Sequence, residues 1–138
     1  MKKVMLILSL FFLNFFSFGQ AGPLVGTLAI NKGEINARWN DKIEYVFKVK
    51  NAGKDPINIQ KIITSCECQD ADPNNVQTIQ PGKFGNIKIK VMVSEKQLNT
   101  QFKEGNGVID YDKSVIVETN GQKAKYQLYT RAKIRIID

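Results

Sequence analysis

The sequence predicts an all-β protein, an Ig-like antiparallel β-sandwich of about seven strands. Runs of alternating apolar and charged residues recur along residues 34–138, as in strands with one buried face. Turn-forming Gly, Pro, Asn and Asp separate these runs at intervals of about eight to twelve residues. No stretch after the first 20 residues has a convincing amphipathic helical pattern. We therefore expect one sandwich domain over residues 34–138, preceded by an N-terminal segment or edge strand over residues 20–33.

Residues 1–19 have the features of a secretory signal peptide. Lys2 and Lys3 precede a long apolar run, and Ser17 and Gly19 supply the small residues of a cleavage site. The apolar run of about 15 residues is shorter than the roughly 20 that span a bilayer. We therefore expect cleavage and export, either to the periplasm or outside the cell, with no membrane span in the mature chain.

The clearest strand lies within residues 42–51, where apolar and charged residues alternate with a period of two. The residues expected to face the core are Ile43, Tyr45, Phe47 and Val49. An isoleucine-rich strand is expected after Pro56, because proline is tolerated at the start of a strand.

Pro81 and Gly82 predict a type II turn, since proline suits its second position and glycine the positive φ of its third. The strand that follows is expected to bury Ile87, Ile89, Val91 and Val93. The polar stretch over residues 94–107 is expected to hold a short helical turn at residues 96–98.

Asn120 and Gly121 predict a two-residue type I′ hairpin, because both central residues of that turn need positive φ. This turn would pair Val117 with Ala124, Val115 with Tyr126, and Glu118 with Lys123. The last strand would bury Leu128, Ala132, Ile134 and Ile136, and its length makes it a candidate exposed edge.

Cys66 and Cys68 are the only cysteines, and four interpretations of the pair stay open. Alternate residues of a regular strand lie about 6 to 7 Å apart, so a disulfide requires a sharp bend at Glu67. A local disulfide or two packed thiols would be structural. Reversible thiol exchange is a third interpretation, and binding of a soft ion such as Cu(I) is the fourth and less favoured.

The rest of the sequence argues against catalysis. There is no histidine, which removes the usual bases of serine and cysteine hydrolases. Asp110 and Asp112 form an acid pair, but such a pair near a strand start is usually a solvated edge. No phosphate-binding or dinucleotide motif is present, and no cofactor is expected.

A set of basic residues is expected at outward strand positions, and some of them would form one basic binding face. Its partner would be another protein or an anionic component of the cell envelope. The alternative is that these charges only prevent edge-to-edge aggregation. Nucleic acid is not expected, because aromatic residues are not interleaved with the basic ones. The residues are Lys48, Lys50, Lys88, Lys90, Arg131, Lys133 and Arg135.

Four ordered motifs resemble a known family: a phenylalanine strand ending in Asn-x-Gly, a Ser-Cys-x-Cys segment, a Pro-Gly turn before a strand, and a Lys-Ser segment with a following Asn. The chain is similar to the bacterial domain-of-unknown-function family 1573, exported Ig-like domains related to ASH and major-sperm-protein sandwiches. The resemblance implies a fold and an export route, and it brings no activity. Glu67 and Gln69 depart from the family's glycine and threonine. The matching residues are Phe47, Asn51, Gly53, Ser65, Cys66, Cys68, Pro81, Gly82, Gly85, Lys113, Ser114, Val117 and Asn120.

The sequence therefore predicts an exported, non-catalytic Ig-like module that works by binding or assembly, through a basic face, loop tips or an exposed strand edge. The alternative is a periplasmic thiol protein that uses Cys66 and Cys68 for redox exchange or Cu(I) binding.

Overall fold

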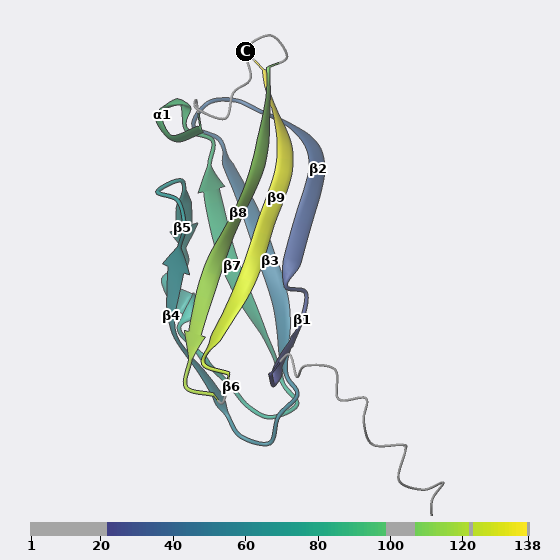
Figure 1. The fold of residues 1–138 in the computed structure, drawn as a ribbon, viewed down its shortest axis with the longest axis vertical. Helices are drawn as coiled ribbons and strands as arrows, with labels where there is room; N and C mark the ends of the chain where they lie inside the picture. Colours follow the sequence, from purple (N-terminus) through teal and green to yellow (C-terminus); the bar gives the residue numbers. More distant parts are fainter. Residues whose placement is uncertain (1–21, 99–106, 122, 138) are drawn as a thin grey trace, which may run out of the picture.

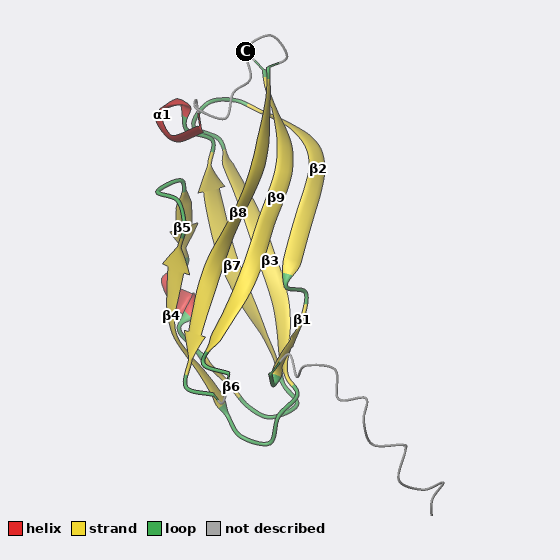
Figure 2. Cartoon of the chain, viewed as in Figure 1, coloured by secondary structure: helices red, strands yellow, loops and turns green. Residues whose placement is uncertain are grey.

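The computed structural model describes residues 22–98, 107–121 and 123–137, which form two β-sheets packed face to face (Figure 1). Strands make up nearly all of the regular structure, as Figure 2 shows. The all-β sandwich predicted from the sequence is confirmed. The predicted signal peptide, residues 1–19, lies outside the described residues. Within the described ranges, no helix has the length and apolar character needed to cross a membrane.

Sheet A has four strands in the order β1, β3, β7 and β5, all antiparallel. These strands are β1 (Leu24–Gly26), β3 (Lys42–Asn51), β7 (Phe84–Met92) and β5 (Gln69–Ala71). The predicted alternation of β3 and β7 is confirmed, since both strands bury every second side chain. The fully buried residues are Tyr45, Phe47, Val49, Ile87, Ile89 and Val91.

Sheet B has five strands in the order β2, β9, β8, β4 and β6. They are β2 (Ala29–Ala37), β9 (Lys125–Ile136), β8 (Val108–Thr119), β4 (Ile57–Thr64) and β6 (Thr78–Ile79). The long β8–β9 pair forms the centre of this sheet. It supplies the core with Ile109, Tyr111, Val115, Val117, Leu128, Ala132 and Ile134.

The last strand, β9, is not an exposed edge, so that prediction is wrong. The N-terminal segment contributes β1 to the edge of sheet A and then crosses to sheet B as β2. There β2 runs parallel to β9 and covers it, whereas the other strand pairs are antiparallel. A parallel pair needs a long connection, and here nearly the whole domain lies between its two strands. The open edge beside β9 is therefore β2.

The register predicted for the last hairpin is also wrong, by two residues. Val117 pairs with Tyr126, and Glu118 pairs with Lys125, to which it forms an ion pair at 3.7 Å. Neither Asn120 nor Gly121 has the positive φ of a type I′ turn. The reason is a contact across the sheet: Asn58 N–H donates to Asn120 Oδ1 at 2.8 Å, and Asn120 N–H donates to the Asn58 carbonyl. Asn120 therefore extends the β4–β8 pairing instead of starting a two-residue turn.

The Pro81–Gly82 turn has the predicted geometry. Gly82 has a φ of 75°, and Lys83 N–H donates to the Gln80 carbonyl at 3.0 Å. Beyond this turn, Gly85 is needed for space, because a Cβ there would lie 2.7 Å from the Cδ1 of Ile79. A 3-10 turn, η1 (Pro73–Asn75), precedes β6. The predicted helical turn is present as α1 (Glu95–Leu98), and residues 99–106 lie outside the described residues.

Candidate functional site

The two cysteines lie in a tight turn between β4 and β5 and form a disulfide. Gln69 N–H donates to the Cys66 carbonyl at 3.1 Å, which closes a four-residue turn around Glu67 and brings the two Cα atoms to 5.1 Å. Glu67 does not adopt positive φ. The bend therefore costs a glutamate no more than other residues, although the family pattern has glycine at this position.

The disulfide faces the core. Cys68 is only 1% exposed, and the half-buried Cys66 packs against the core residues. Its sulfur also accepts a hydrogen bond of 3.0 Å from Cys68 N–H. Of the interpretations open from the sequence, a local structural disulfide agrees best with this arrangement. Among residues 22–98, 107–121 and 123–137, no three His, Cys, Asp or Glu side chains are grouped as ligands of a metal ion.

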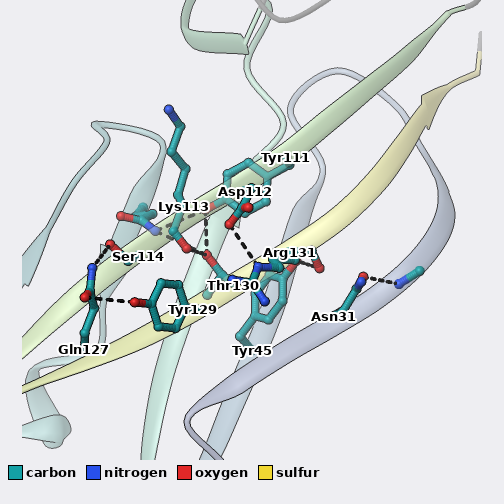
Figure 3. A network of polar contacts seen from close by, with 12 residues as sticks. Asn31, Tyr45, Tyr111, Asp112, Lys113, Ser114, Gln127, Tyr129, Thr130 and Arg131 are labelled. Carbon is teal, nitrogen blue, oxygen red and sulfur yellow. Dashed lines mark hydrogen bonds and ion pairs between the residues drawn. The ribbon is translucent and has the colours of Figure 1, made fainter.

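Three buried polar residues lie beneath this turn, and we refer to Gln69, Tyr111 and Thr130 as the buried polar cluster. The Gln69 amide nitrogen donates to Tyr111 Oη at 3.1 Å, and Tyr111 Oη lies 3.0 Å from Thr130 Oγ1. Thr130 Oγ1 donates to the Lys113 carbonyl at 3.0 Å, so the Tyr111 hydroxyl is left to donate to Thr130. The result is a directed chain of hydrogen bonds from sheet A to sheet B, part of which is visible in Figure 3.

Ser65 connects the disulfide turn to this cluster. Its N–H donates to Gln69 Oε1 at 3.0 Å, and its hydroxyl donates to the Ser114 carbonyl at 2.6 Å. Gln69 is therefore bonded at both ends of its side-chain amide. A buried glutamine is stable only with such partners, and here it orients the turn relative to β8.

A second tyrosine joins the sheets nearby. The Tyr45 hydroxyl, from β3, donates to the Arg131 carbonyl of β9 at 2.9 Å. Burial raises the pKa of Tyr45, and the neighbouring Tyr111 raises it further. Burial also raises the pKa of Tyr111, although its hydrogen bonds to Thr130 and Gln69 act in the opposite direction. Both phenols therefore remain neutral hydrogen-bonding groups in the interior.

Asn51 has a role that the sequence reasoning did not assign. Its buried amide nitrogen donates to the carbonyls of Asp55 and Ile79 at 2.7 and 2.9 Å, and its Oδ1 accepts from Gly53 N–H. It therefore fastens the loop after β3 to β6. The sequence contained a signal for this role: Asn51 occupies the next inward-facing position after Val49, and Gly53 follows two residues later.

The structure divides the seven basic residues predicted to face outward between two surfaces. Lys48 and Lys50 on β3, with Lys88 and Lys90 on β7, lie on the outer face of sheet A. Arg131, Lys133 and Arg135 lie on β9, on the outer face of sheet B. These faces point away from each other across the sandwich, so the seven residues do not form one face.

On the outer face of sheet B, cations are matched by carboxylates. Arg131 Nε lies 3.1 Å from Asp112 Oδ1, and Arg135 binds Glu34 at 2.7 Å. Lys133 lies between Asp110 of β8 and Glu34 of β2 in the register. Figure 3 shows how the Arg131–Asp112 pair continues along β9 through Tyr129 and Gln127 to Ser114. Asp110 and Asp112 are thus solvated, but they lie on the outer face of an interior strand and not at the edge predicted from the sequence.

The outer face of sheet A carries exposed apolar side chains instead. Phe84 is 60% exposed, and Val46 and Met92 are about 40% exposed. Lys48 and Lys50 hold their ammonium groups 4.7 and 5.5 Å from the centre of the Phe84 ring. The sequence reasoning missed Phe84, although a signal was available: it stands out of phase with Ile87, Ile89 and Val91.

A shallow hollow of about 920 Å³ lies near the Ile57 end of β4. Its walls come from the N-terminal segment at Gly22 and Pro23, from the loop around Gly53, and from the β8–β9 turn at Asn120. The disulfide turn follows the other end of β4, so this hollow and the buried polar cluster are separate features.

Three solved structures are similar to this chain in fold. A protein of unknown function from Porphyromonas gingivalis W83 matches 88% of this chain with a TM-score of 0.56 and 18% identity. This chain spans 51% of that protein's length. The ASH/PapD-like domain 7 of human CEP192 matches 85% of this chain over 87% of its own length, at a TM-score of 0.55 and 10% identity. The secreted serine protease VesC from Vibrio cholerae matches 86% of this chain over 24% of its own length, at a TM-score of 0.54 and 12% identity.

At these identities the likeness concerns the fold alone, which is a sandwich of the ASH or PapD type. The comparison with curated proteins gives no match. The family model for "Protein of unknown function (DUF1573)" matches residues 26–134, from the last residue of β1 to Ile134 in β9. The chain therefore belongs to the DUF1573 family, as its ordered motifs predict.

Proposed function

We propose that the protein is a non-catalytic binding or assembly module that makes its contacts through the outer face of sheet A. The exposure of Phe84, 60% on the surface of a sheet, is the observation that carries this proposal. Aromatic side chains are among the residue types that most often anchor a partner at a protein interface. Val46 and Met92 are further exposed apolar side chains on the same face, separated from Phe84 by polar and charged residues.

The interior supports a structural rather than a catalytic use of its polar groups. Gln69, Tyr111 and Thr130 are bonded to one another and to the backbone. Cys66 and Cys68 are joined in a disulfide, and Cys68 is buried. The alternative of a thiol or Cu(I) protein therefore has less support than a binding module.

Export through a signal peptide at residues 1–19 is part of the proposal, on the basis of the sequence of that segment. The mass of the protein recovered from the cell envelope or the medium tests it. We expect an exported chain that begins near Gln20. Recovery of the protein from the cytoplasm with residues 1–19 still attached would contradict export.

Site-specific photo-crosslinking in the producing cells tests the contact face. A benzophenone amino acid at position 84 of β7 should give a discrete adduct with a partner, because the ring it replaces points into solvent. The same amino acid at position 133 of β9, on the outer face of sheet B, is the matched control. An adduct at position 133 but none at position 84 would place the contact elsewhere.

A further inference from the structure

The outer face of sheet A has two halves of different charge. In the half toward the end of β7, Lys90 lies between Glu44 of β3 and Asp70 of β5 in the register, so positive and negative charges alternate across the sheet. In the half toward the start of β7, Lys48 lies opposite Asn86, and Lys50 lies opposite Phe84. We refer to Val46, Lys48, Lys50, Phe84 and Lys88 as the basic half-face.

Lys48 and Lys50 have no carboxylate beside them among the residues that the structure describes. On its other side Lys50 meets Val25 of β1, and both ammonium groups lie over the ring of Phe84. Lys88 has Asp72 as a neighbour, since Asp72 N–H donates to the Lys88 carbonyl. The Asp72 carboxylate, however, accepts the Asn74 N–H at 2.8 Å and caps the turn η1. The basic half-face thus combines unpaired positive charge with exposed apolar surface.

The dimensions of this region limit the occupant. From residue 46 to residue 50 a strand extends about 13 Å, and neighbouring strands lie about 4.8 Å apart. A bilayer surface laid on the whole outer face of sheet A would also meet Glu44 and Asp70, and anionic head groups would be repelled there. A narrow segment can stay within the basic half-face and avoid both carboxylates.

Resting on the proposed function, we infer that the basic half-face binds a short acidic segment of another protein. Carboxylates of that segment lie against Lys48 and Lys50, one of its apolar side chains packs on Phe84, and another packs on Val46. The positive charge is complementary to the segment's acidic groups, and the apolar contact distinguishes this site from a purely electrostatic one. The opposite surface of the sandwich is not complementary in this way, because its arginines are already paired with Asp112 and Glu34.

Binding of a synthetic probe to the purified protein tests the inference. The probe is a short fluorescein-labelled peptide of alternating Glu and Leu, followed by fluorescence anisotropy. The double variant Lys48→Ser/Lys50→Ser should weaken binding by at least about tenfold, and the matched variant Lys42→Ser/Lys90→Ser on the same face should change it by less than about twofold. Lys48→Arg/Lys50→Arg should retain binding, and Phe84→Ser should weaken it. Affinity should fall as NaCl rises from about 0.05 M to about 0.3 M.

Four outcomes overturn the inference. Equal binding of a Gln and Leu peptide would remove the acidic requirement. Binding of phosphatidylglycerol vesicles in place of the peptide, with the same variant pattern, would make the partner a lipid surface. Absence of peptide binding, together with crosslinked adducts at position 84 in cells, would refute the acidic segment and leave the proposed function standing. Absence of peptide binding and of those adducts would refute both the acidic segment and the proposed function.

The melting temperatures of the variants should match that of the parent, since all the substituted side chains are on the surface.

Discussion

Polar groups occupy two contrasting settings in this sandwich. In the buried polar cluster, Gln69, Tyr111 and Thr130 are shielded from water and bonded to one another in a directed chain. In the basic half-face, Lys48 and Lys50 stand in solvent beside an exposed aromatic ring. In the buried polar cluster the polar groups are already bonded to one another, so few of them can bind a ligand from outside. In the basic half-face these two ammonium groups have no carboxylate partner among the described residues and can bind one.

This difference separates stability from binding within one small domain. Removing one member of a buried chain of hydrogen bonds leaves its partners without hydrogen bonds, which lowers the free energy of unfolding. Removing a solvated lysine or a half-exposed ring costs little stability, because water takes its place. Variants in the cluster should therefore change the free energy of unfolding, and variants in the half-face should change binding. The following predictions are ordered by their expected effect on the free energy of unfolding.

Gln69→Ala should have the largest effect, a loss of about 3 kcal/mol in the free energy of unfolding. The substitution removes an acceptor for Ser65 N–H and a donor to Tyr111 and Thr130, and it leaves a cavity between the sheets. Urea denaturation followed by circular dichroism measures the change. Asp70→Ala, the next residue of β5, is the matched control, because Asp70 is exposed and should give a change within about 0.5 kcal/mol. Equal effects of the two substitutions would show that the cluster does not hold the sheets together.

Alkaline pH should weaken the same region through its tyrosines. The folded-state pKa values of Tyr45 and Tyr111 are raised by burial, so the unfolded chain loses these protons first, near its ordinary pKa of about 10. The free energy of unfolding should then fall as pH rises above about 10, by up to about 1.4 kcal/mol per pH unit for each tyrosine until its folded-state pKa is passed. Below about pH 9 both groups are protonated in either state and contribute almost no slope.

Urea denaturation at a series of alkaline pH values measures that slope. The control is Tyr45→Phe/Tyr111→Phe, which removes both ionisations while Tyr126 and Tyr129 remain. The variant should be less stable at neutral pH, since Tyr45 loses its bond to the Arg131 carbonyl, but its stability should depend less on alkaline pH. An unchanged slope would assign the alkaline sensitivity to other groups.

Reduction of the disulfide should have an intermediate effect. The loop it closes spans a sequence separation of only two residues, so the loss of stability from chain entropy is about 1.5 kcal/mol. Denaturation with and without a reductant, with thiol counting to confirm the state, measures it. Cys66→Ser/Cys68→Ser should show no further response to reductant. Binding of the acidic probe should persist after reduction, whereas its loss would link the disulfide turn to the basic half-face.

The sequence predicts the local features of the fold well and its long-range pairings poorly. Alternation along β3 and β7 identifies their core residues, because each strand has one buried and one solvated face. The register of the last hairpin depends instead on Asn120 meeting Asn58, a partner 62 residues away that no local turn preference reveals. The interior position of β9 likewise depends on β2, which is distant in sequence and parallel.

The candidate site shows the same limit. Spacing alone leaves the Cys66–Cys68 disulfide undecided, because the outcome depends on the backbone at Glu67. The period of two predicts that Lys48, Lys88 and Arg135 face outward, but it cannot say that they belong to different sheets. Which lysines have a neighbouring carboxylate follows only from the cross-strand register, since the two acidic residues beside Lys90 come from two different strands.

Phe84→Ser should have the smallest effect on stability and should weaken binding of the acidic probe. The ring is 60% exposed, and its contacts with Lys48 and Lys50 are exposed cation–π contacts, so the free energy of unfolding should fall by less than about 1 kcal/mol. Met92→Ser is the matched control, because Met92 is a partly exposed apolar residue of the same strand and face but lies opposite Lys42, outside the basic half-face. Both variants should unfold much as the parent does, and only Phe84→Ser should lose binding of the acidic probe. If both lost binding equally, the contact would extend over the whole outer face of sheet A, and the division of that face by Glu44 and Asp70 would have no role in choosing the partner.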